Sequence, residues 1–376
     1  MNLRLLFVDD DAMLLNSTRR QLRLKLPDCE LAFCRSAAEA MRHVEQATPD
    51  IILSDVRMPD VDGPELLRRV SLAHPETIRI AWTGQSETRQ IQRVFGVAHQ
   101  ILSKPCPTEK LVHLISSLGE FRHPIRRSWL LAKLTAPGNG HFDASRLHRV
   151  LQRLDAPESS ARSIAALIDE SPMARARLLG LANSPFFSPA VPVVETSQAI
   201  TLVGFDMVKA IFIASELNSA QDHPPAVAGE IRRCLDDGIE MSIRVGRSAS
   251  REGLGEVERS AAMIAALFHR FGAVQFAIHG AEDYVDARQT AGADSEALLQ
   301  LEQALFGVDR FSVAAYFLSV WGLAPKACQA IASLANRTES DSPMARVLRE
   351  VLSPSETPPA VRRGVDRPPV GAPEWG

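Results

Sequence analysis

The first 120 residues alternate short apolar runs with stretches in which apolar residues recur at helical spacing. The runs are rich in Leu, Ile and Val and cover residues 3–8, 29–34, 50–54, 78–83 and 99–104. Such runs predict strands that are buried on both faces, as in a parallel sheet. Helices are predicted between them, for example over 12–26 and over 36–47, where Ser36 is the expected N-cap. Residues 1–120 are therefore predicted to form five βα units, a doubly wound parallel sheet with helices on both sides.

The pattern changes after residue 120. Residues 121–140 contain Pro124, Pro137 and two glycines, and residues 121–160 hold seven Lys or Arg against three Asp or Glu, so 121–140 is predicted to be a basic linker. From 141 to 338 every periodic segment is helical. Ser171 and Pro172 are expected to begin a helix, and Gly204 and Gly322 to follow helix ends. The tail, 352–376, has six prolines and no apolar periodicity, which predicts disorder.

Composition narrows the class of protein. A chain of 376 residues with 45% hydrophobic and 23% charged residues is typical of a globular protein of two or three domains. The net charge of −3 provides no global attraction to nucleic acid or anionic lipid. The five cysteines form no CxxC pair, which indicates free thiols in a reducing compartment. The longest uncharged apolar helical run, 261–268, is too short to span a bilayer, so a cytoplasmic protein without membrane insertion is expected.

Chemically useful residues follow the predicted strands. In a doubly wound sheet, ligands bind at the carboxyl edge of the strands. The residues found there are Asp9, Asp10, Asp55, Thr83 and Lys104. Three carboxylates at one edge remain ionised together only around a cation, and an all-oxygen donor set suits Mg²⁺. Asp55 can then act as a nucleophile toward phosphorus, while Thr83 and Lys104 neutralise the phosphoryl oxygens.

These residues lie in the segments "FVDDD", "SDVRMPDVDG", "AWTG" and "LSKPC", which resemble the receiver domain of two-component response regulators in order and spacing. The resemblance implies that Asp55 is the phospho-acceptor, that Asp9, Asp10 and the backbone carbonyl of Arg57 complete the Mg²⁺ site, that Thr83 is the switch hydroxyl, and that Lys104 binds phosphate. It also implies a sensor histidine kinase or phosphotransfer protein as partner. Receivers can form homodimers through helices that correspond to 86–96 and 107–119. Ile101 departs from the family, which often has an inward-swinging aromatic residue there.

The helical half resembles an HDOD domain, an all-helical relative of HD phosphohydrolases. The resemblance rests on "LLGLANS" (178–184), "QAITLVGFD" (198–206), "AALFHRFG" (265–272), "FGVDRFSVAAYFL" (306–318) and "VWGLAPKACQAI" (320–331). It implies a regulatory output module in bacterial signalling that binds a protein or ligand. Active HD enzymes need a first histidine, a His-Asp pair and a later aspartate. Here the pair is His269-Arg270, and Gly238 or a neighbour occupies the first position.

We therefore expect a response regulator of a bacterial phosphorelay whose output domain is not an enzyme. One neutral imidazole cannot hold a divalent ion, and Arg270 would repel it, so His269 is expected to be structural. Two alternatives stay open: residual metal-dependent hydrolysis of a cyclic dinucleotide, and DNA binding. Against DNA binding, 206–217 contains Lys209 among apolar residues and is expected to be a buried helix rather than a recognition helix. The cations of the linker (Arg122, Arg126, Arg127, Lys133) are expected to be solvated, and Cys106 to fill space.

Overall fold

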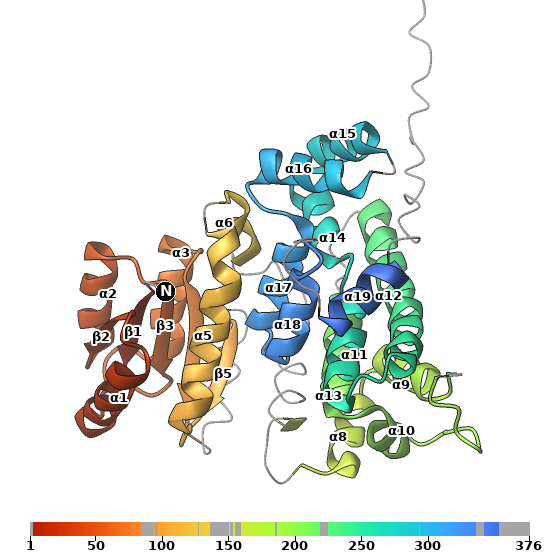
Figure 1. Cartoon of the computed structure of the whole chain (residues 1–376). Helices are drawn as coiled ribbons and strands as arrows, with labels where there is room; N and C mark the ends of the chain where they lie inside the picture. Colours follow the sequence, from red (N-terminus) through yellow and green to blue (C-terminus); the bar gives the residue numbers. More distant parts are fainter. Residues whose placement is uncertain are drawn as a thin grey trace, which may run out of the picture.

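The computed structural model describes most of the chain (Figure 1). The described residues are 3–84, 93–94, 97–126, 128–135, 150, 153–154, 159–184, 186–218, 225–292, 294–335 and 342–352. The expected helix over 86–96 and the expected disordered tail lie almost entirely outside these ranges. Residues 93 and 94, which belong to the former, are helical.

The N-terminal part is a five-stranded parallel sheet in the order β2-β1-β3-β4-β5. The strands are β1 (Arg4–Val8), β2 (Glu30–Cys34), β3 (Ile51–Asp55), β4 (Ile78–Thr83) and β5 (Gln100–Ser103). Each lies within one residue of the range that its apolar run predicts. The predicted doubly wound sheet is therefore confirmed, with the short strand β5 at one edge.

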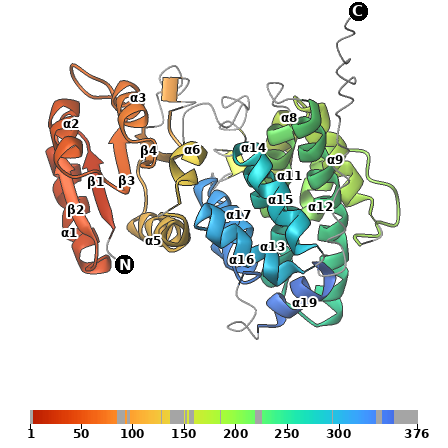
Figure 2. The ribbon, with the colours of Figure 1, turned by 90° about the horizontal axis from the view of Figure 1, so that it is seen from above.

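Helices cover both faces of the sheet. Helices α1 (Ala12–Lys25) and α5 (Thr108–Ile125) pack on one face, and α2 (Ala37–Gln46) and α3 (Gly63–Ala73) pack on the other, as Figure 2 shows from above. Ser36 caps α2 as predicted, because its hydroxyl accepts a hydrogen bond from the backbone N–H of Glu39 at 3.2 Å. Because loops join the carboxyl ends of the strands to the helices, polar residues of those loops share one edge.

The segment after the receiver-like sheet differs from the expected linker. Helix α5 continues through Pro124 to Ile125, and α6 (Leu130–Thr135) follows after a short turn. Arg122 is buried rather than solvated: it forms an ion pair with Asp50 and donates to the carbonyl of Glu76 at 3.2 Å. The expectation failed because the acidic partner lies 72 residues away in the chain, and because α5 continues to Ile125 although Pro124 lies inside it. The buried part of this segment is therefore a structural connector.

The C-terminal part is largely helical over its described residues. Its helices are α8 (Ala161–Ile168), α9 (Pro172–Ala182), α10 (Thr196–Val203), α11 (Phe205–Asn218), α12 (Pro225–Arg251), α13 (Glu256–Leu267), α14 (Phe271–His279), α15 (Ala281–Ala291), α16 (Ser295–Phe306), α17 (Arg310–Val320), α18 (Pro325–Ala332) and α19 (Pro343–Leu352). Ser171 and Pro172 begin α9 as predicted, and Gly204 and Gly322 end α10 and α17 with φ of 86° and 67°. Helix α19 lies beyond the predicted domain and was not expected.

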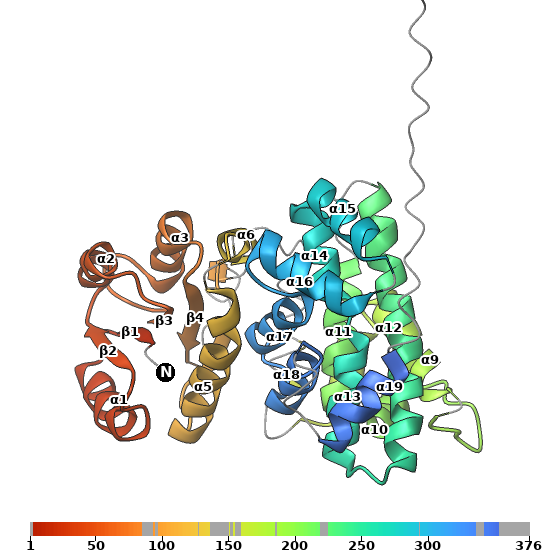
Figure 3. The same ribbon diagram turned by 45° about the horizontal axis from the view of Figure 1, so that its top comes forward.

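The two parts pack against each other. Helix α5 contacts α17, and apolar residues of β4, α5, α6 and α17 belong to one continuous buried cluster. Figures 1 and 3 show the sheet and the helical bundle side by side with α5 between them. The chain is therefore not two units separated by an open linker.

Among the residues that the structure describes, one helical stretch is long and apolar enough to cross a membrane by length and composition. It runs from Glu256 to His279, comprises α13 and α14, and has 72% of its window buried inside the protein. The apolar pair α10 and α11 also passes this test when joined, although the two helices meet at an angle of 117°. Burial at this level is typical of the core helices of a soluble protein.

Candidate functional site

Three carboxylates meet at the carboxyl edge of the sheet. Asp9 and Asp10 follow β1, and Asp55 is the last residue of β3. One ligand oxygen from each lies within 4.8 Å of the others. Asp9 and Asp55 are buried, whereas Asp10 is exposed, so the cluster opens to solvent on one side. The sequence predicted this cluster, and the structure brings its members together.

Lys104 supplies the positive charge of the site. Its Nζ lies 2.6 Å from Oδ2 of Asp9 and 2.5 Å from Oδ1 of Asp55. Burial disfavours the ammonium, but the hydrogen bonds to Asp55 and Asp9 outweigh it and raise the pKa of Lys104. The Trp82 ring centroid lies 5.4 Å from the same Nζ. Lys104 therefore remains protonated and bridges two carboxylates directly.

Thr83 is the buried last residue of β4. Its hydroxyl donates to the carbonyl of Gly84 at 3.1 Å, and its own carbonyl accepts from the backbone N–H of Lys104 at 2.7 Å. The ends of β4 and β5 are thus joined beside the carboxylates, where the predicted hydroxyl is found.

The loop after β3 folds back on Asp55 and depends on Gly63. The N–H of Gly63 donates to the carbonyl of Val56 at 3.1 Å, and a Cβ at Gly63 would lie 1.9 Å from the carbonyl oxygen of Asp55. A larger residue therefore cannot occupy this position without displacing Asp55. Gly63 was not among the predicted site residues. Its signal in the sequence is its place eight residues after the candidate nucleophile, in the segment "SDVRMPDVDG".

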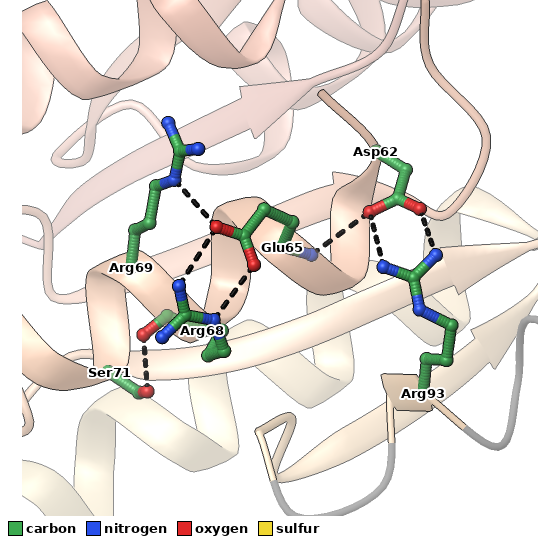
Figure 4. A network of polar contacts seen from close by, with 6 residues as sticks. All are labelled: Asp62, Glu65, Arg68, Arg69, Ser71 and Arg93. Atoms are coloured by element: carbon green, nitrogen blue, oxygen red, sulfur yellow. Dashed lines mark hydrogen bonds and ion pairs between the residues drawn. The ribbon is translucent and has the colours of Figure 1, made fainter. Parts of the chain in front are cut away.

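A network of charged residues fixes the start of α3 next to this loop (Figure 4). Asp62 caps α3 by accepting from the N–H of Glu65 at 3.1 Å, and it forms an ion pair with Arg93. Glu65 in turn accepts hydrogen bonds from Arg68 and Arg69, each at 2.8 Å, and these lower the pKa of Glu65 to about 2. The network connects α3 to the helical residues 93 and 94.

The acidic site fits a hard divalent cation. Its donors are carboxylate oxygens close together at a solvent-open edge, and this triad is typical of the Mg²⁺ site of receiver domains. Arg57, whose backbone carbonyl the resemblance assigns to the metal, lies in the loop two residues after Asp55, with an exposed side chain. Its part in binding stays a prediction. Cys106, which is half-buried near the site, has its pKa raised by burial, and the thiol form is therefore favoured.

His269 has the surroundings of a structural residue. It is 7% exposed, and its Nδ1 is 2.7 Å from the carbonyl oxygen of Ala266. Burial lowers the pKa of His269 to about 4 despite the hydrogen bond to Ala266, and the charges of Arg270 and Arg310 act in the same direction as burial. The imidazole is therefore neutral at physiological pH, and its hydrogen bond to the backbone agrees with the expected structural role.

The neighbouring positions also lack the geometry of a metal site. Arg270 forms an ion pair with Asp237 at 2.8 Å, so the carboxylate of Asp237 already has a cationic partner. A Cβ at Gly238 would lie 2.2 Å from the carbonyl oxygen of Leu267. Helices α12 and α13 therefore approach too closely for a ligand side chain at Gly238, where the first histidine of an HD enzyme was expected.

The late acidic position is occupied by a helix cap. Asp309 accepts hydrogen bonds from the N–H groups of Phe311 and Ser312, both at 2.9 Å, and so begins α17. The next residue, Arg310, is buried and pairs with the buried carboxylate of Glu302 at 2.9 Å. Both residues have structural partners, and neither lies in a cluster of metal-ligating groups among the described residues.

Helix α11 is buried as expected. Ile211, Phe212, Ile213 and Ala214 are all at most 2% exposed, and the Lys209 ammonium donates to the carbonyl of Gly322 at 2.6 Å. The side chains that a recognition helix would present to a DNA groove are thus part of the core.

Comparison with known proteins divides the chain in the same way. The family model of the response regulator receiver domain matches residues 5–116, and that of the HDOD domain matches residues 143–336. The receiver domain of an HD domain-containing protein from Pseudomonas fluorescens is 27% identical, covers 33% of this chain and 98% of its own, and has a TM-score of 0.30. A phosphohydrolase described as putative, from Shewanella amazonensis, is 18% identical, covers 56% of this chain and 75% of its own, and has a TM-score of 0.43.

Curated relatives match parts of the chain. The transcriptional regulatory protein TrcR of Mycobacterium tuberculosis is 32% identical over 31% of this chain and 45% of its own length. A protein-glutamate methylesterase/protein-glutamine glutaminase of Pseudomonas fluorescens is 26% identical over 61% of this chain and 66% of its own. The chain spans less than half the length of the first of these. Because the HDOD match covers more than half of the 376 residues, the chain belongs to the HDOD family, and a response regulator receiver domain precedes its HDOD domain.

Proposed function

We propose that this protein is a response regulator of a bacterial phosphorelay, that Asp55 is its phospho-acceptor, and that the HDOD domain is a non-catalytic output that binds a protein or ligand. The observation that carries the proposal is the contact of Lys104 with Asp9 and Asp55 at 2.6 and 2.5 Å, within a carboxylate triad open to solvent. A cytoplasmic location agrees with this function.

The proposed reaction is a phosphoryl transfer to a carboxylate. A carboxylate oxygen of Asp55 attacks phosphorus, and a P–O bond forms. The P–N bond of a phosphohistidine on a sensor kinase or phosphotransfer protein breaks, and the imidazole nitrogen keeps the electron pair and takes up a proton. With acetyl phosphate as donor, the broken bond is P–O and acetate leaves.

The residues around Asp55 have separate roles in this step. The carboxylates of Asp9, Asp10 and Asp55, with the backbone carbonyl of Arg57, would hold Mg²⁺, which when bound neutralises the charge of the phosphoryl oxygens. Lys104 moves from the carboxylate to a phosphoryl oxygen, and Thr83 donates its hydroxyl to another. Asp9 and Asp10 do not act as nucleophiles, because their carboxylates would hold the cation.

Three observations support a binding role rather than a catalytic role for the HDOD domain. The ion pair between Arg270 and Asp237, the close approach at Gly238, and the buried neutral imidazole of His269 each argue against a bound catalytic metal. Without that metal, water is not activated for attack on a phosphoester. The burial of α11 similarly argues against DNA reading by this helix.

The experiment is labelling of the full-length protein with radioactive acetyl phosphate in the presence and absence of Mg²⁺. We expect labelling that requires Mg²⁺ and that is abolished in Asp55→Asn, because an amide is not a nucleophile toward phosphorus under these conditions. Asp28→Asn, a surface aspartate outside the site, serves as the control and should label like the wild type. Equal labelling of Asp55→Asn and the wild type would refute the proposal.

A further inference from the structure

A side chain of the receiver holds the end of a helix in the HDOD domain. Gln100 is the first residue of β5, and its Nε2 donates to the carbonyl oxygens of Ser319 at 3.0 Å and Val320 at 2.7 Å. Both carbonyls belong to the last turn of α17. In Figures 1 and 3 this helix lies next to α5, and Figure 1 labels the edge strand β5 beside α5.

The end of α17 needs hydrogen-bond donors. The last four carbonyls of a helix have no partner within it. Gly322, with φ of 67°, turns the chain back so that its N–H reaches the carbonyl of Ser319 and the N–H of Leu323 reaches that of Leu318. The carbonyl of Val320 receives its hydrogen bond from Gln100. The helix end is thus completed by the receiver.

Strand β5 connects this contact to the phosphorylation site. It is an edge strand of four residues that pairs with β4 on one side. Gln100 begins it, and Lys104, the residue after its end, contacts Asp55. The backbones of Gln100 and Lys104 are therefore about 13 Å apart along one short strand. Lys104 contacts Oδ1 of Asp55 at 2.5 Å, so a phosphoryl group added to that oxygen would take the place of the direct contact.

We propose that Gln100 is a latch through which phosphorylation of Asp55 controls the docking of α17 on the receiver. Displacement of Lys104 shifts β5, and the contact of Gln100 with Ser319 and Val320 is lost. The face of α17 that α5 and β5 cover is then released for the partner of the HDOD domain. This inference rests on the proposed function of Asp55.

Other contacts between the two domains are placed to act as a hinge. The hydroxyl of Ser128 donates to the carbonyl of Phe306, and Nε1 of Trp129 donates to the carbonyl of Leu305 at 3.4 Å. Both residues lie in the turn before α6, away from β5 in the sequence. They hold the connector on the end of α16 while the α17 contact opens.

The latch must work in both directions. If phosphorylation weakens docking, then weakened docking must favour phosphorylation by the same factor. Loss of two neutral hydrogen bonds of ordinary strength shifts the docking equilibrium by about tenfold. Gln100→Glu should have a larger effect than Gln100→Ala, because a carboxylate has no donor and repels the two carbonyl oxygens.

The test uses the full-length wild type, Gln100→Glu and Gln100→Ala. Gln303→Ala is the matched control, because Gln303 donates to the carbonyl of Gly307 at 2.9 Å with both partners inside the HDOD domain. The first measurement is hydrogen exchange of 318–323 without phosphodonor. We expect about tenfold faster exchange in Gln100→Ala, a larger increase in Gln100→Glu, and no change in Gln303→Ala. Equal exchange in all four proteins overturns the latch.

The second measurement adds acetyl phosphate and Mg²⁺. We expect faster exchange of 318–323 in the wild type but not in Asp55→Asn, and more labelling of the Gln100 variants than of the wild type at subsaturating acetyl phosphate. Labelling of wild-type Asp55 without any change in exchange refutes the latch and leaves the proposed function intact. Absence of labelling refutes the proposed function, whereas the first measurement still decides whether Gln100 holds the docked state.

Discussion

Single buried polar residues hold distant segments of this protein together. Arg79 is 2% exposed and has carbonyl oxygens rather than a carboxylate as partners: those of Val97 at 2.6 Å, Thr77 at 2.9 Å and Thr135 at 2.7 Å. Burial lowers its pKa to about 10, so the guanidinium remains charged at neutral pH. The side chain joins β4 to the last turn of α6. It also donates hydrogen bonds to backbone carbonyls that would otherwise be buried without a partner.

His269 provides a prediction at the residue scale. Its folded-state pKa of about 4 lies below the ordinary value of 6.5, so the folded protein binds fewer protons than the unfolded chain between these values. The stability from neutral burial is complete above pH 6.5 and falls by about 1.4 kcal/mol per pH unit as the pH decreases toward 4. His269→Gln should remove this part of the pH dependence, as urea unfolding at pH 7.0 and 5.5 would reveal. If the wild type and His269→Gln lost the same stability between pH 7.0 and 5.5, His269 would not be the group that causes this pH dependence.

The structural consequence of Ile101 could not be predicted from the sequence. The sequence showed that the aromatic residue of many receivers is absent there, but not what replaces its effect. In the structure Ile101 is half-buried and packs against the buried cluster on the face of the sheet that α2 and α3 cover, a cluster that includes Val94. Gln100, its neighbour, contacts α17 instead. This strand can therefore communicate with the output domain through a polar side chain, which no motif indicates.

At the scale of elements, the strands were predictable because their residues are buried on both faces. All residues of β3 and β4 are buried, so the apolar runs that predict them are nearly uninterrupted. The carboxylate site follows from this, since residues after parallel strands must meet at one edge. The end of α5 was not predictable, because Pro124 and the nearby cations were interpreted without their partners, and Arg122 pairs with Asp50 from far away in the chain.

Close helix packing gives a prediction at this scale. Gly238→Ala should destabilise the protein by about 2–3 kcal/mol, because its Cβ would lie 2.2 Å from the carbonyl oxygen of Leu267. Gly180→Ala in α9 is the matched control, since its Cβ would meet nothing within 4 Å. Alanine should stabilise that helix position by up to about 1 kcal/mol. Chemical denaturation of both variants measures the difference, and similar stabilities would contradict the close approach.

Gly238 also provides a test of the proposal that the HDOD domain binds no catalytic metal. Purified full-length protein should contain no stoichiometric Fe, Mn or Zn, and Gly238→His should not acquire any, because the backbones of α12 and α13 leave no room for the imidazole. Metal analysis by mass spectrometry checks this. One equivalent of Fe, Mn or Zn per chain that remains bound in Asp55→Asn, in which the receiver site has lost a carboxylate, would revive the alternative of a phosphohydrolase.

At the scale of the whole molecule, the sequence identified two domains but not their docking. Contacts such as that of Gln100 with Val320 join residues 220 apart in the sequence, and neither partner is unusual for its own element. Periodicity and capping report the environment of one element at a time, so an interface between two complete folds leaves little signal in either. For the same reason α19, which packs on α12 and α13, fell outside the expected domain.

The packing of the receiver domain against the HDOD domain leads to a prediction about unfolding. Because one buried apolar cluster includes residues of both domains, the wild type should unfold in a single thermal transition. Arg79→Met removes the donors to the carbonyls of Thr77, Val97 and Thr135, which should cost about 2–4 kcal/mol and separate the receiver transition from that of the HDOD domain. Arg93→Met, which breaks an ion pair of an arginine with a side chain 56% exposed, should cost less than about 1 kcal/mol and preserve one transition. Calorimetry distinguishes the two cases. Two transitions in the wild type would mean that the domains unfold independently and that the shared core contributes little to coupling between them.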